Sequence, residues 1–382
     1  MISFSKRGSS SFRKWWWSLD STTFMLLIVL LVVGSILITT ASPAVADRLK
    51  ISSFYFAHRQ FIFLFMGLGI IIFISALEEK QLRRLVLLSV VACFAMLVLV
   101  LLVGDEVKGS RRWIATPFTS LQPSELLKPF YIFICGMLLA ERHNRKDFPG
   151  FKACIIMHFF LVALLFLQPD FGMVITYTSV LAGQFFLAGL SLWWIAVVGI
   201  IGITGAFGAY SFLPHVARRI DNFLNPENAD NYQVEKSLEA YINGGLFGRG
   251  PGEGTVKAHL PDSHTDFIFA VAGEEFGAIF SCMIILLFLG LTIRGLYLLS
   301  KEDNLFRIYT GGGIIILFAL QTIFNIGVTL HIFPTKGMTL PFISYGGSSM
   351  FSFSIAFGIF LNLTKKRYEV TIPRSRSLIM TR

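Results

Sequence analysis

His264 and Asp266 stand at the start of a long apolar segment, in the run His-Thr-Asp-Phe-Ile-Phe. Burial among apolar residues raises the pKa of a carboxyl group and makes its carboxylate a stronger base, while a nearby cation keeps it ionised. Asp266 therefore suits a general base that removes a proton from a substrate. An Asp before an apolar run is also a common helix N-cap. The residues alone leave both roles open.

A second group of candidates combines positive charge with aromatic and small residues. Lys108 and Arg112 precede Trp113 in the run Lys-Gly-Ser-Arg-Arg-Trp-Ile. Lysine and arginine bind phosphate through charge-assisted hydrogen bonds, so this run suits a phosphate-bearing amphiphile at a membrane surface. The alternative is an interfacial anchor, because such basic and aromatic residues also fix helices at the membrane boundary.

Further charged residues lie at the ends of apolar segments, where each needs a partner. Glu125 and Lys128 are three residues apart, so on a helix they can pair with each other. Alternatively, Lys128 pairs with Asp266 on another helix. Asp170, in Gln-Pro-Asp-Phe-Gly, lies in a tight turn between two apolar segments.

The region after residue 333 contains Lys336 and then the run Ser344-Tyr-Gly-Gly-Ser-Ser. Its small residues suit either close helix packing or anion binding by backbone amides. Signatures of other enzyme classes are absent from the sequence, including GxxxxGK[ST], HExxH and GxSxG. The four cysteines lie inside apolar runs, so the sequence gives no support for a disulfide framework, a zinc site or an iron–sulfur cluster.

Membrane-spanning helices must position these residues. Hydrophobic residues make up 54% of the 382-residue chain, and only 15% of the residues are charged, against about 25% in soluble domains. This composition excludes soluble, disordered and coiled-coil proteins and predicts an all-α polytopic membrane protein. A helix needs roughly 20 apolar residues to cross a bilayer. Ten segments approach that length: 23–42, 60–77, 85–103, 125–140, 153–168, 171–189, 192–213, 267–297, 310–333 and 349–364. The eighth is too long for one crossing, so its first part, to about Glu275, is expected in or above the interface.

The distribution of basic residues predicts the orientation. Lys and Arg exceed Asp and Glu by 10, and 20 of the 33 basic residues flank the side that holds both termini. Because basic flanks mark the cytoplasmic side, both termini are predicted to be cytoplasmic, and no nucleic-acid partner is expected. Most candidate residues then lie near the outer face. The predicted organisation is one membrane domain, 1–382, with cytoplasmic segments 1–22 and 365–382 and outer loops 104–124, 214–266 and 334–348.

Seven short motifs extend in a fixed order to Ser349. They are Lys-Gly-x-x-Arg-Trp-Ile, Gln-Pro-x-Glu, Gln-Pro-Asp-x-Gly, Gly-Gly-x-x-Gly-x-Gly, Leu-Pro-x-x-His-Thr-Asp-Phe-Ile-Phe-Ala, Glu-Glu-x-Gly and Leu-Pro-x-x-Ser-Tyr-Gly-Gly-Ser-Ser. In these motifs the chain resembles the SEDS family (shape, elongation, division and sporulation) over nearly its whole length. It departs from the common pattern at Asp262-Ser263, Met173 and Ala258.

This resemblance implies ten transmembrane helices, as counted above, and a peptidoglycan glycosyltransferase that polymerises lipid II. It also implies that the protein acts in the bacterial inner membrane together with a class B penicillin-binding protein, which is a transpeptidase. Pro334-Thr335-Lys336-Gly337 is more similar to the cell-division branch than to the elongation branch, which implies septal cell-wall synthesis with other division proteins. The essential aspartate of the family falls on Asp266.

The implied reaction agrees with a single catalytic carboxylate. Glycosidases use two carboxylates because a poor leaving group needs an acid as well as a base. Lipid II already carries a good leaving group, a polyprenyl diphosphate, so one base is enough if cations stabilise that diphosphate. Asp266 is therefore the expected general base. The expected substrate-binding residues are Lys108, Arg112, Trp113, Lys128, Asp170, Arg218, Lys257, His264, Lys336 and Ser344, supported by Glu125, Gln168 and Glu275. A divalent cation, Mg²⁺ or Mn²⁺, is an alternative source of positive charge, and the sequence does not decide.

Other function classes stay open. A lipid II flippase would place polar residues through the depth of the helix bundle, whereas here they gather near the predicted outer ends of the segments. That distribution favours surface chemistry. A noncatalytic division scaffold would leave Asp266 without a role. An elongation-type polymerase is the other alternative.

Overall fold

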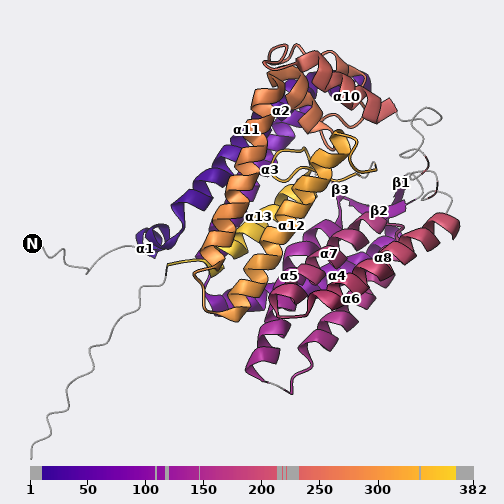
Figure 1. Cartoon of the computed structure of the whole chain (residues 1–382). Coiled ribbons are helices and arrows are strands. Elements are labelled where there is room, and N and C mark those ends of the chain that lie inside the picture. The colour runs from indigo at the N-terminus through magenta and orange to yellow at the C-terminus, as the bar shows by residue number, and fades with distance from the viewer. Residues whose placement is uncertain are drawn as a thin grey trace, which may run out of the picture.

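The computed structural model describes residues 11–107, 110–116, 120–145, 147–212, 217, 221, 232–334 and 337–366. Ten long helices form a bundle (Figure 1). They are α2 (Ser21–Leu49), α3 (Tyr55–Ala76), α4 (Glu79–Val103), α5 (Pro123–Asn144), α6 (Gly150–Leu167), α7 (Phe171–Leu187), α8 (Leu192–Phe212), α11 (Ile268–Leu299), α12 (Leu305–Thr329) and α13 (Gly347–Leu363). Each predicted segment overlaps one of these helices. In the described chain seven are long and apolar enough to cross a membrane, and α7 and α13 are shorter apolar helices.

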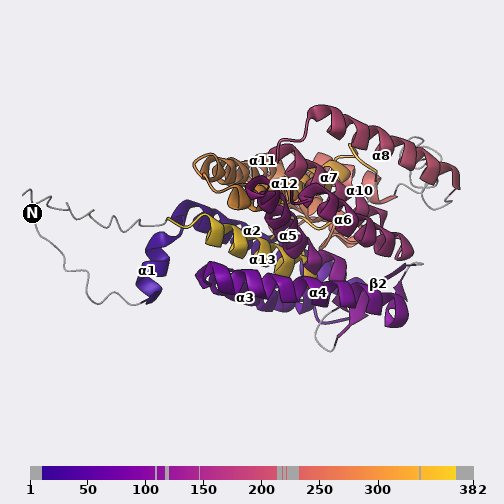
Figure 2. The same ribbon diagram turned by 90° about the horizontal axis from the view of Figure 1, so that it is seen from below.

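The centre of the bundle is α5, which lies between α4 on one side and α12 on the other (Figure 2). About 83% of its apolar stretch is buried, against 22% for α4. Gly136 permits this central packing, because a Cβ atom there would lie 2.2 Å from Oγ1 of Thr310 on α12. The peripheral helices direct exposed leucine, isoleucine and phenylalanine side chains outward, as expected of lipid-facing surfaces.

Four groups of elements were not predicted from the sequence. Helix α1 (Ser11–Ser18) precedes the first long helix, and the 104–124 loop forms a small antiparallel sheet in the order β1-β2-β3. The strands are β1 (Asp105–Val107), β2 (Ser110–Ala115) and β3 (Ser120–Leu121). The 214–266 loop contains α10 (Tyr232–Gly244) and the short 3-10 helix η2 (Val256–Ala258). Short elements escape detection because their apolar periodicity covers too few residues.

Helix α11 is broken at Gly277, whose φ of 81° lies in the left-handed region. A Cβ atom at this position would lie 2.4 Å from the backbone nitrogen of Gly248, so only glycine fits. The break frees backbone carbonyl groups, and the loop after α10 satisfies two of them. The amides of Arg249 and Gly250 donate to the carbonyl oxygens of Glu274 and Glu275 at 3.0 and 2.9 Å. The long eighth segment is thus two helical pieces, divided two residues after the boundary expected from its length.

Candidate active site

Asp266 lies in the turn directly before α11 and is partly exposed. The N-cap of α11 is Phe267, so the position of Asp266 is one residue outside the helix cap. The helix-cap alternative therefore does not describe this residue. An added Cβ atom at Gly337 would lie 3.1 Å from Oδ2 of Asp266, which places the carboxylate against the loop that precedes α13.

Three consecutive carbonyl groups hold the Asp266 turn in place. Their donors come from three points on two other segments, α12 and the loop before α13, so the backbone at Asp266 cannot rotate independently of them. Tyr345 N donates to the carbonyl oxygen of His264 at 2.9 Å, Ser344 Oγ to that of Thr265 at 2.5 Å, and Asn325 Nδ2 to that of Asp266 at 2.9 Å. Ser344, expected to bind substrate, instead has its hydroxyl engaged in positioning this turn.

Asn325 and Ser344 also fix the loop that faces the carboxylate. Asn325 Nδ2 donates to the carbonyl oxygen of Met338 at 2.5 Å, and the backbone nitrogen of Leu340 donates to Ser344 Oγ at 2.7 Å. Asn325 is 1% exposed, so its amide group makes these hydrogen bonds in the protein interior. The Asp266 turn and the loop around Gly337 are therefore joined into one unit through α12.

His264 is a packing residue beside Asp266. Its ring centroid lies 4.4 Å from that of Phe56 and 5.4 Å from that of Tyr345. Burial lowers the pKa of His264 to about 4, so the imidazole is neutral near pH 7. His264 was expected to bind substrate. A neutral ring offers an anionic group no positive charge, so such a role would depend on hydrogen bonding.

We expect His264 to make the folded protein less stable at acidic pH. The unfolded residue titrates near 6.5 and the folded one near 4, so the unfolded chain holds the extra proton between these pH values. Stability therefore falls as the pH drops from 6.5 towards 4, by about 2 kcal/mol at pH 5 from this residue. The thermal midpoint in detergent at pH 7 and pH 5 measures this. His264→Phe keeps an aromatic ring against Phe56 and should show a smaller difference between the two pH values; an unchanged difference would contradict the assignment.

Lys128 pairs with Glu125 and not with Asp266. Its Nζ lies 2.8 Å from Oε1 of Glu125 and 2.9 Å from Oε1 of Gln321, and the lysine is 1% exposed. The Lys128–Asp266 pair is therefore a wrong prediction, and the i, i+3 alternative is the one that the structure contains. The ammonium is buried and already donates to two acceptors, so the structure gives no support for the expectation that Lys128 binds substrate.

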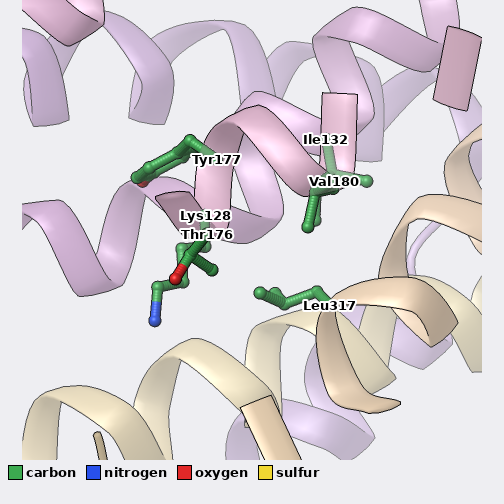
Figure 3. A pocket seen from close by; sticks show the side chains of 6 residues that line it. All are labelled: Lys128, Ile132, Thr176, Tyr177, Val180 and Leu317. Atoms are coloured by element: carbon green, nitrogen blue, oxygen red, sulfur yellow. The ribbon is translucent and has the colours of Figure 1, made fainter. Parts of the chain in front are cut away.

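A small gap lies beside Lys128, between α5, α7 and α12 (Figure 3). Figure 3 shows the ammonium pointing away from the apolar part of this gap. The gap has no room for a water molecule, whereas ligand pockets measure roughly 300–1,000 Å³. It is therefore a packing defect in the core and not a binding site. The side chains that line it are Lys128, Ile132, Thr176, Tyr177, Val180 and Leu317.

Gln321 connects Lys128 to the Asp266 unit. Its Nε2 donates to the carbonyl oxygen of Thr339 at 3.0 Å, while its Oε1 accepts from Lys128. Gln321 and Asn325 are four residues apart on α12, so they lie on the same face of that helix. The sequence reasoning missed both residues. The available signal was a pair of amides at i, i+4 in an otherwise apolar segment.

Arg112, Gln168 and Asp170 come together at a separate turn before α7. The Arg112 guanidinium donates to the carbonyl groups of Gln168 and Pro169 and lies 3.7 Å from the Asp170 carboxylate. Asp170 caps α7 by accepting from the backbone nitrogen of Met173. Asp170 is thus a capping residue, and Arg112 keeps 26% of its side chain exposed.

The remaining residues of this group have structural contacts. The Nε2 atom of Gln168 donates to the carbonyl group of Leu97 at 3.0 Å. Trp113 lies in β2, opposite Asp105 of β1, with a half-buried side chain. Gln122 links this turn to the start of α13. Its backbone nitrogen donates to Ser348 Oγ at 2.9 Å, and its side chain donates to Asp170 at 3.3 Å.

Lys257 and Glu275 form a buried ion pair that fixes the large loop. The Lys257 ammonium donates to the Glu275 carboxylate and to the carbonyl oxygens of Thr40 and Gly252, the latter two at 2.9 and 2.8 Å. Three acceptors use all three of its protons, so the expectation that Lys257 binds diphosphate is not supported. Glu274 holds the same loop by accepting from the backbone nitrogen of Val256 at 2.9 Å.

Three expected cationic residues, Lys108, Arg218 and Lys336, lie outside the described residues. In the described part of the chain, no three His, Cys, Asp or Glu residues come close enough to share a metal ion. A cavity of about 320 Å³ lies between the Arg83 end of α4, the end of α5 and the start of α12. It is lined by Glu141 and Asp303, among others, and lies at the start of α12, whereas Asn325, which binds the Asp266 turn, is near the other end of that helix.

The fold and the site define a polytopic α-helical membrane protein with one partly exposed, rigidly held carboxylate at the end of its bundle. The family model described as "Cell cycle protein", which groups FtsW, RodA and SpoVE, matches residues 20–369. The chain belongs to this family, as the SEDS resemblance had indicated.

Similar proteins carry division and sporulation names. The chain is 38% identical over 335 residues to "Probable peptidoglycan glycosyltransferase FtsW" of Caulobacter vibrioides, covering 87% of this chain and 86% of that protein. It is 35% identical over 340 residues to "Stage V sporulation protein E" of Bacillus subtilis, covering 87% and 93%.

Solved structures share the fold. One chain, from "Structural coordination of polymerization and crosslinking by a peptidoglycan synthase complex", has a TM-score of 0.74 at 24% identity and covers 91% of this chain and 98% of its own length. The rod shape determining protein RodA of Thermus thermophilus has a TM-score of 0.68 at 24% identity, covering 91% and 97%.

Proposed function

We propose that this protein is a peptidoglycan glycosyltransferase of cell division that polymerises lipid II, with Asp266 as its general base. The relatives named for this activity are 38% identical to the chain or somewhat less, over most of its length. The observation that carries the assignment is the geometry of Asp266, a partly exposed carboxylate on a backbone held by three consecutive carbonyl hydrogen bonds. Such fixed placement is what general-base catalysis requires.

In the proposed reaction Asp266 takes the proton of the acceptor sugar hydroxyl. The hydroxyl oxygen then forms a bond to the anomeric carbon of the donor, and the polyprenyl diphosphate leaves with the electrons of the broken bond. Cations must stabilise that leaving group. Lys108, Arg218, Lys336 and the exposed part of Arg112 are the proposed cations, since the ammonium groups of Lys128 and Lys257 are already engaged. A divalent cation remains an alternative.

The proposed setting is the outer face of the inner membrane at the division septum, together with a class B penicillin-binding protein. The similarity to a chain of a peptidoglycan synthase complex supports a partner of that kind. Purified protein, with such a transpeptidase, should convert labelled lipid II into glycan chains that gel electrophoresis resolves. If lipid II instead crossed vesicle membranes and no polymer formed under any condition, the flippase alternative would replace this proposal.

The positions of buried charge favour surface chemistry over a transport path. In the described chain the buried charged side chains of the long helices lie in the first two turns of α5 and α12, at the N-caps of α2 and α7 or before the break in α11. A path for the charged head group of lipid II would need ionisable groups along the depth of the bundle. The buried charged groups of the described helices lie near the helix ends or the break and form no such series.

Asn325→Asp should lower polymerisation by roughly 10–10²-fold, because a displacement of about 1 Å at a reacting group has effects of this size. The substitution keeps the shape of the side chain but directs carboxylate oxygens at the carbonyl groups of Asp266 and Met338. A matched control is Thr322→Ser, which keeps the hydroxyl that donates to Phe318 one turn away. Normal turnover by folded Asn325→Asp protein would show that this amide does not position Asp266.

The proposed orientation predicts accessibility of the large loop from outside the cell. A cysteine at the exposed position Glu253, in a chain whose exposed Cys282 is replaced by serine, should react with an impermeant thiol reagent added to intact cells. A cysteine at the exposed Lys301 should react only after the cells are opened. The reverse pattern would invert the topology and everything placed on it.

A further inference from the structure

One edge of α10 exposes large apolar side chains. Leu238 and Ile242 lie one helical turn apart, and Leu246 and Phe247 follow in the turn after the helix. Ile242 is 80% exposed and Phe247 is 81% exposed. These four residues are called the α10 surface below. Contiguous exposed apolar residues of this size indicate contact with a partner or a membrane.

The opposite side of α10 is packed against the segment that carries Asp266. Ala240 belongs to a small buried cluster with Phe267, the residue after Asp266. Ser237 Oγ donates to the carbonyl oxygen of Thr329 at 2.7 Å, at the end of α12. A Cβ atom at Gly244 would lie 2.0 Å from the carbonyl oxygen of Gly273, so α10 and α11 are in backbone contact. A displacement of α10 would therefore also displace the segment that carries Asp266.

The break in α11 indicates where the α10 surface lies relative to the membrane. Residues 278–299, after the break, form a helix about 33 Å long, which matches the roughly 30 Å of bilayer hydrocarbon. One side of this piece is at least half exposed at Ile279, Met283, Leu286 and Ile293, as expected for a lipid-facing helix. Its end near Ile279 therefore reaches the boundary of the hydrocarbon.

The α10 surface continues this lipid-facing side. The backbone nitrogen of Ile279 donates to the carbonyl oxygen of Leu246 at 3.3 Å, so the exposed stripe of α11 leads into Leu246 and Phe247. Figure 1 shows α10 at the end of the bundle, where it packs against α11. The next edge of α10 is polar, with Lys236 and Glu239 2.5 Å apart in a partly exposed ion pair. The edge that carries the α10 surface is thus apolar from Leu238 onward, while exposed Glu235 one turn earlier and the Lys236–Glu239 pair beside it are charged. Apolar and charged sides of this kind are the pattern of helices that lie in a membrane interface.

We propose that the α10 surface is inserted among the lipid acyl chains at the Asp266 end of the bundle, and that α10 thereby sets the height of Asp266 above the hydrocarbon. The occupant is lipid, because the surface is continuous with the lipid-facing side of α11 and not with a protein-covered one. The inference depends on exposure and helix length, so it holds whether or not Asp266 is the catalytic base.

Spin labels test this placement directly. The full chain, with Cys282 replaced by serine, is placed in nanodiscs of phosphatidylethanolamine and phosphatidylglycerol and labelled at Ile242→Cys or Phe247→Cys. Met283→Cys serves as the lipid-facing reference. Glu239→Cys, on the polar edge of the same helix and 46% exposed, is the matched water-facing control. Power saturation compares collisions with oxygen, which concentrates in lipid, and with a water-soluble nickel chelate.

Labels at 242 and 247 should favour oxygen severalfold over the chelate, as the label at 283 does, while the label at 239 should favour the chelate. The proposal is overturned if the labels at 242 and 247 behave like the label at 239, which would leave the surface in water. It is equally overturned if both reagents are excluded at 242 and 247, because a second copy of the chain or another protein would then cover the surface. Gel filtration before labelling confirms that each variant is folded.

Discussion

Asp266→Asn should abolish polymerisation of lipid II while leaving a folded, membrane-inserted protein. Loss of general-base catalysis alone is expected to lower the rate by roughly 10²–10⁴-fold. The fold should survive because the three hydrogen bonds that hold this turn use backbone carbonyl groups, which the substitution does not touch. Asparagine also matches aspartate in size. The measurement is glycan polymer formed per minute by purified protein with its transpeptidase partner.

Asp262→Asn is the matched control, since it makes the same chemical change four residues earlier in the same turn. Asp262 has a φ of 54°, a left-handed conformation that asparagine tolerates as well as aspartate. Its backbone carbonyl accepts from Thr265 and Phe267, and both bonds persist in the variant. We expect near-normal polymerisation. Full activity of folded Asp266→Asn protein, or equal losses in both variants, would refute a catalytic role specific to Asp266.

The long helices were predictable because crossing a bilayer needs a stretch of apolar residues that a sequence displays directly. All ten predicted segments overlap helices of the bundle. The excess length of the eighth segment correctly indicated that its first part is distinct, although the position of the break at Gly277 depends on a backbone conformation that only contact with the loop after α10 explains. The length of a segment can be counted from its own sequence, whereas the break depends on contact between α11 and the loop after α10.

Partners of the buried charges were not predictable in the same way. Lys128 had Glu125 three residues away and Asp266 on another segment as alternatives, and in the structure it binds Glu125 and Gln321 of α12. Lys257 was expected to bind substrate as one of the cations near Asp266 in the sequence, and nothing in the sequence places Glu275 beside it. Local spacing limits the pairs within a helix, while pairs between helices depend on packing that apolar patterns do not specify.

Asp266 itself was found because it stands in a specific motif, yet the residues that hold it were missed. Asn325 and Ser344 act through backbone carbonyl groups, and every residue carries such a group, so the sequence of the Asp266 turn gives no sign of them. The sequence shows only the side chains that donate, those of Asn325 and Ser344. An amide in the apolar segment of α12 was the available indication, since a buried polar side chain needs a partner.

Removing one member of the Lys257–Glu275 pair should produce the largest loss of stability among these variants. Lys257 is 5% exposed and Glu275 is 1% exposed. Lys257→Met would leave the Glu275 carboxylate buried without its cation, which costs roughly 3–5 kcal/mol. The thermal unfolding midpoint in detergent should fall strongly. The loop around Gly252 should also become more sensitive to protease, because the ammonium no longer binds its carbonyl oxygen.

The double variant Lys257→Met with Glu275→Leu separates loss of the pair from loss of packing. Replacing both charges by apolar side chains of similar size leaves no unpaired charge, so the midpoint should recover most of the loss. Lys236→Met, in the partly exposed pair with Glu239, is the matched single substitution and should change stability by less than about 1 kcal/mol. If Lys257→Met were as mild as Lys236→Met, the buried pair would not be what attaches the large loop to α11. If the double variant were no more stable than Lys257→Met alone, the loss would come from the ammonium's bonds to Thr40 and Gly252 and not from the stranded carboxylate.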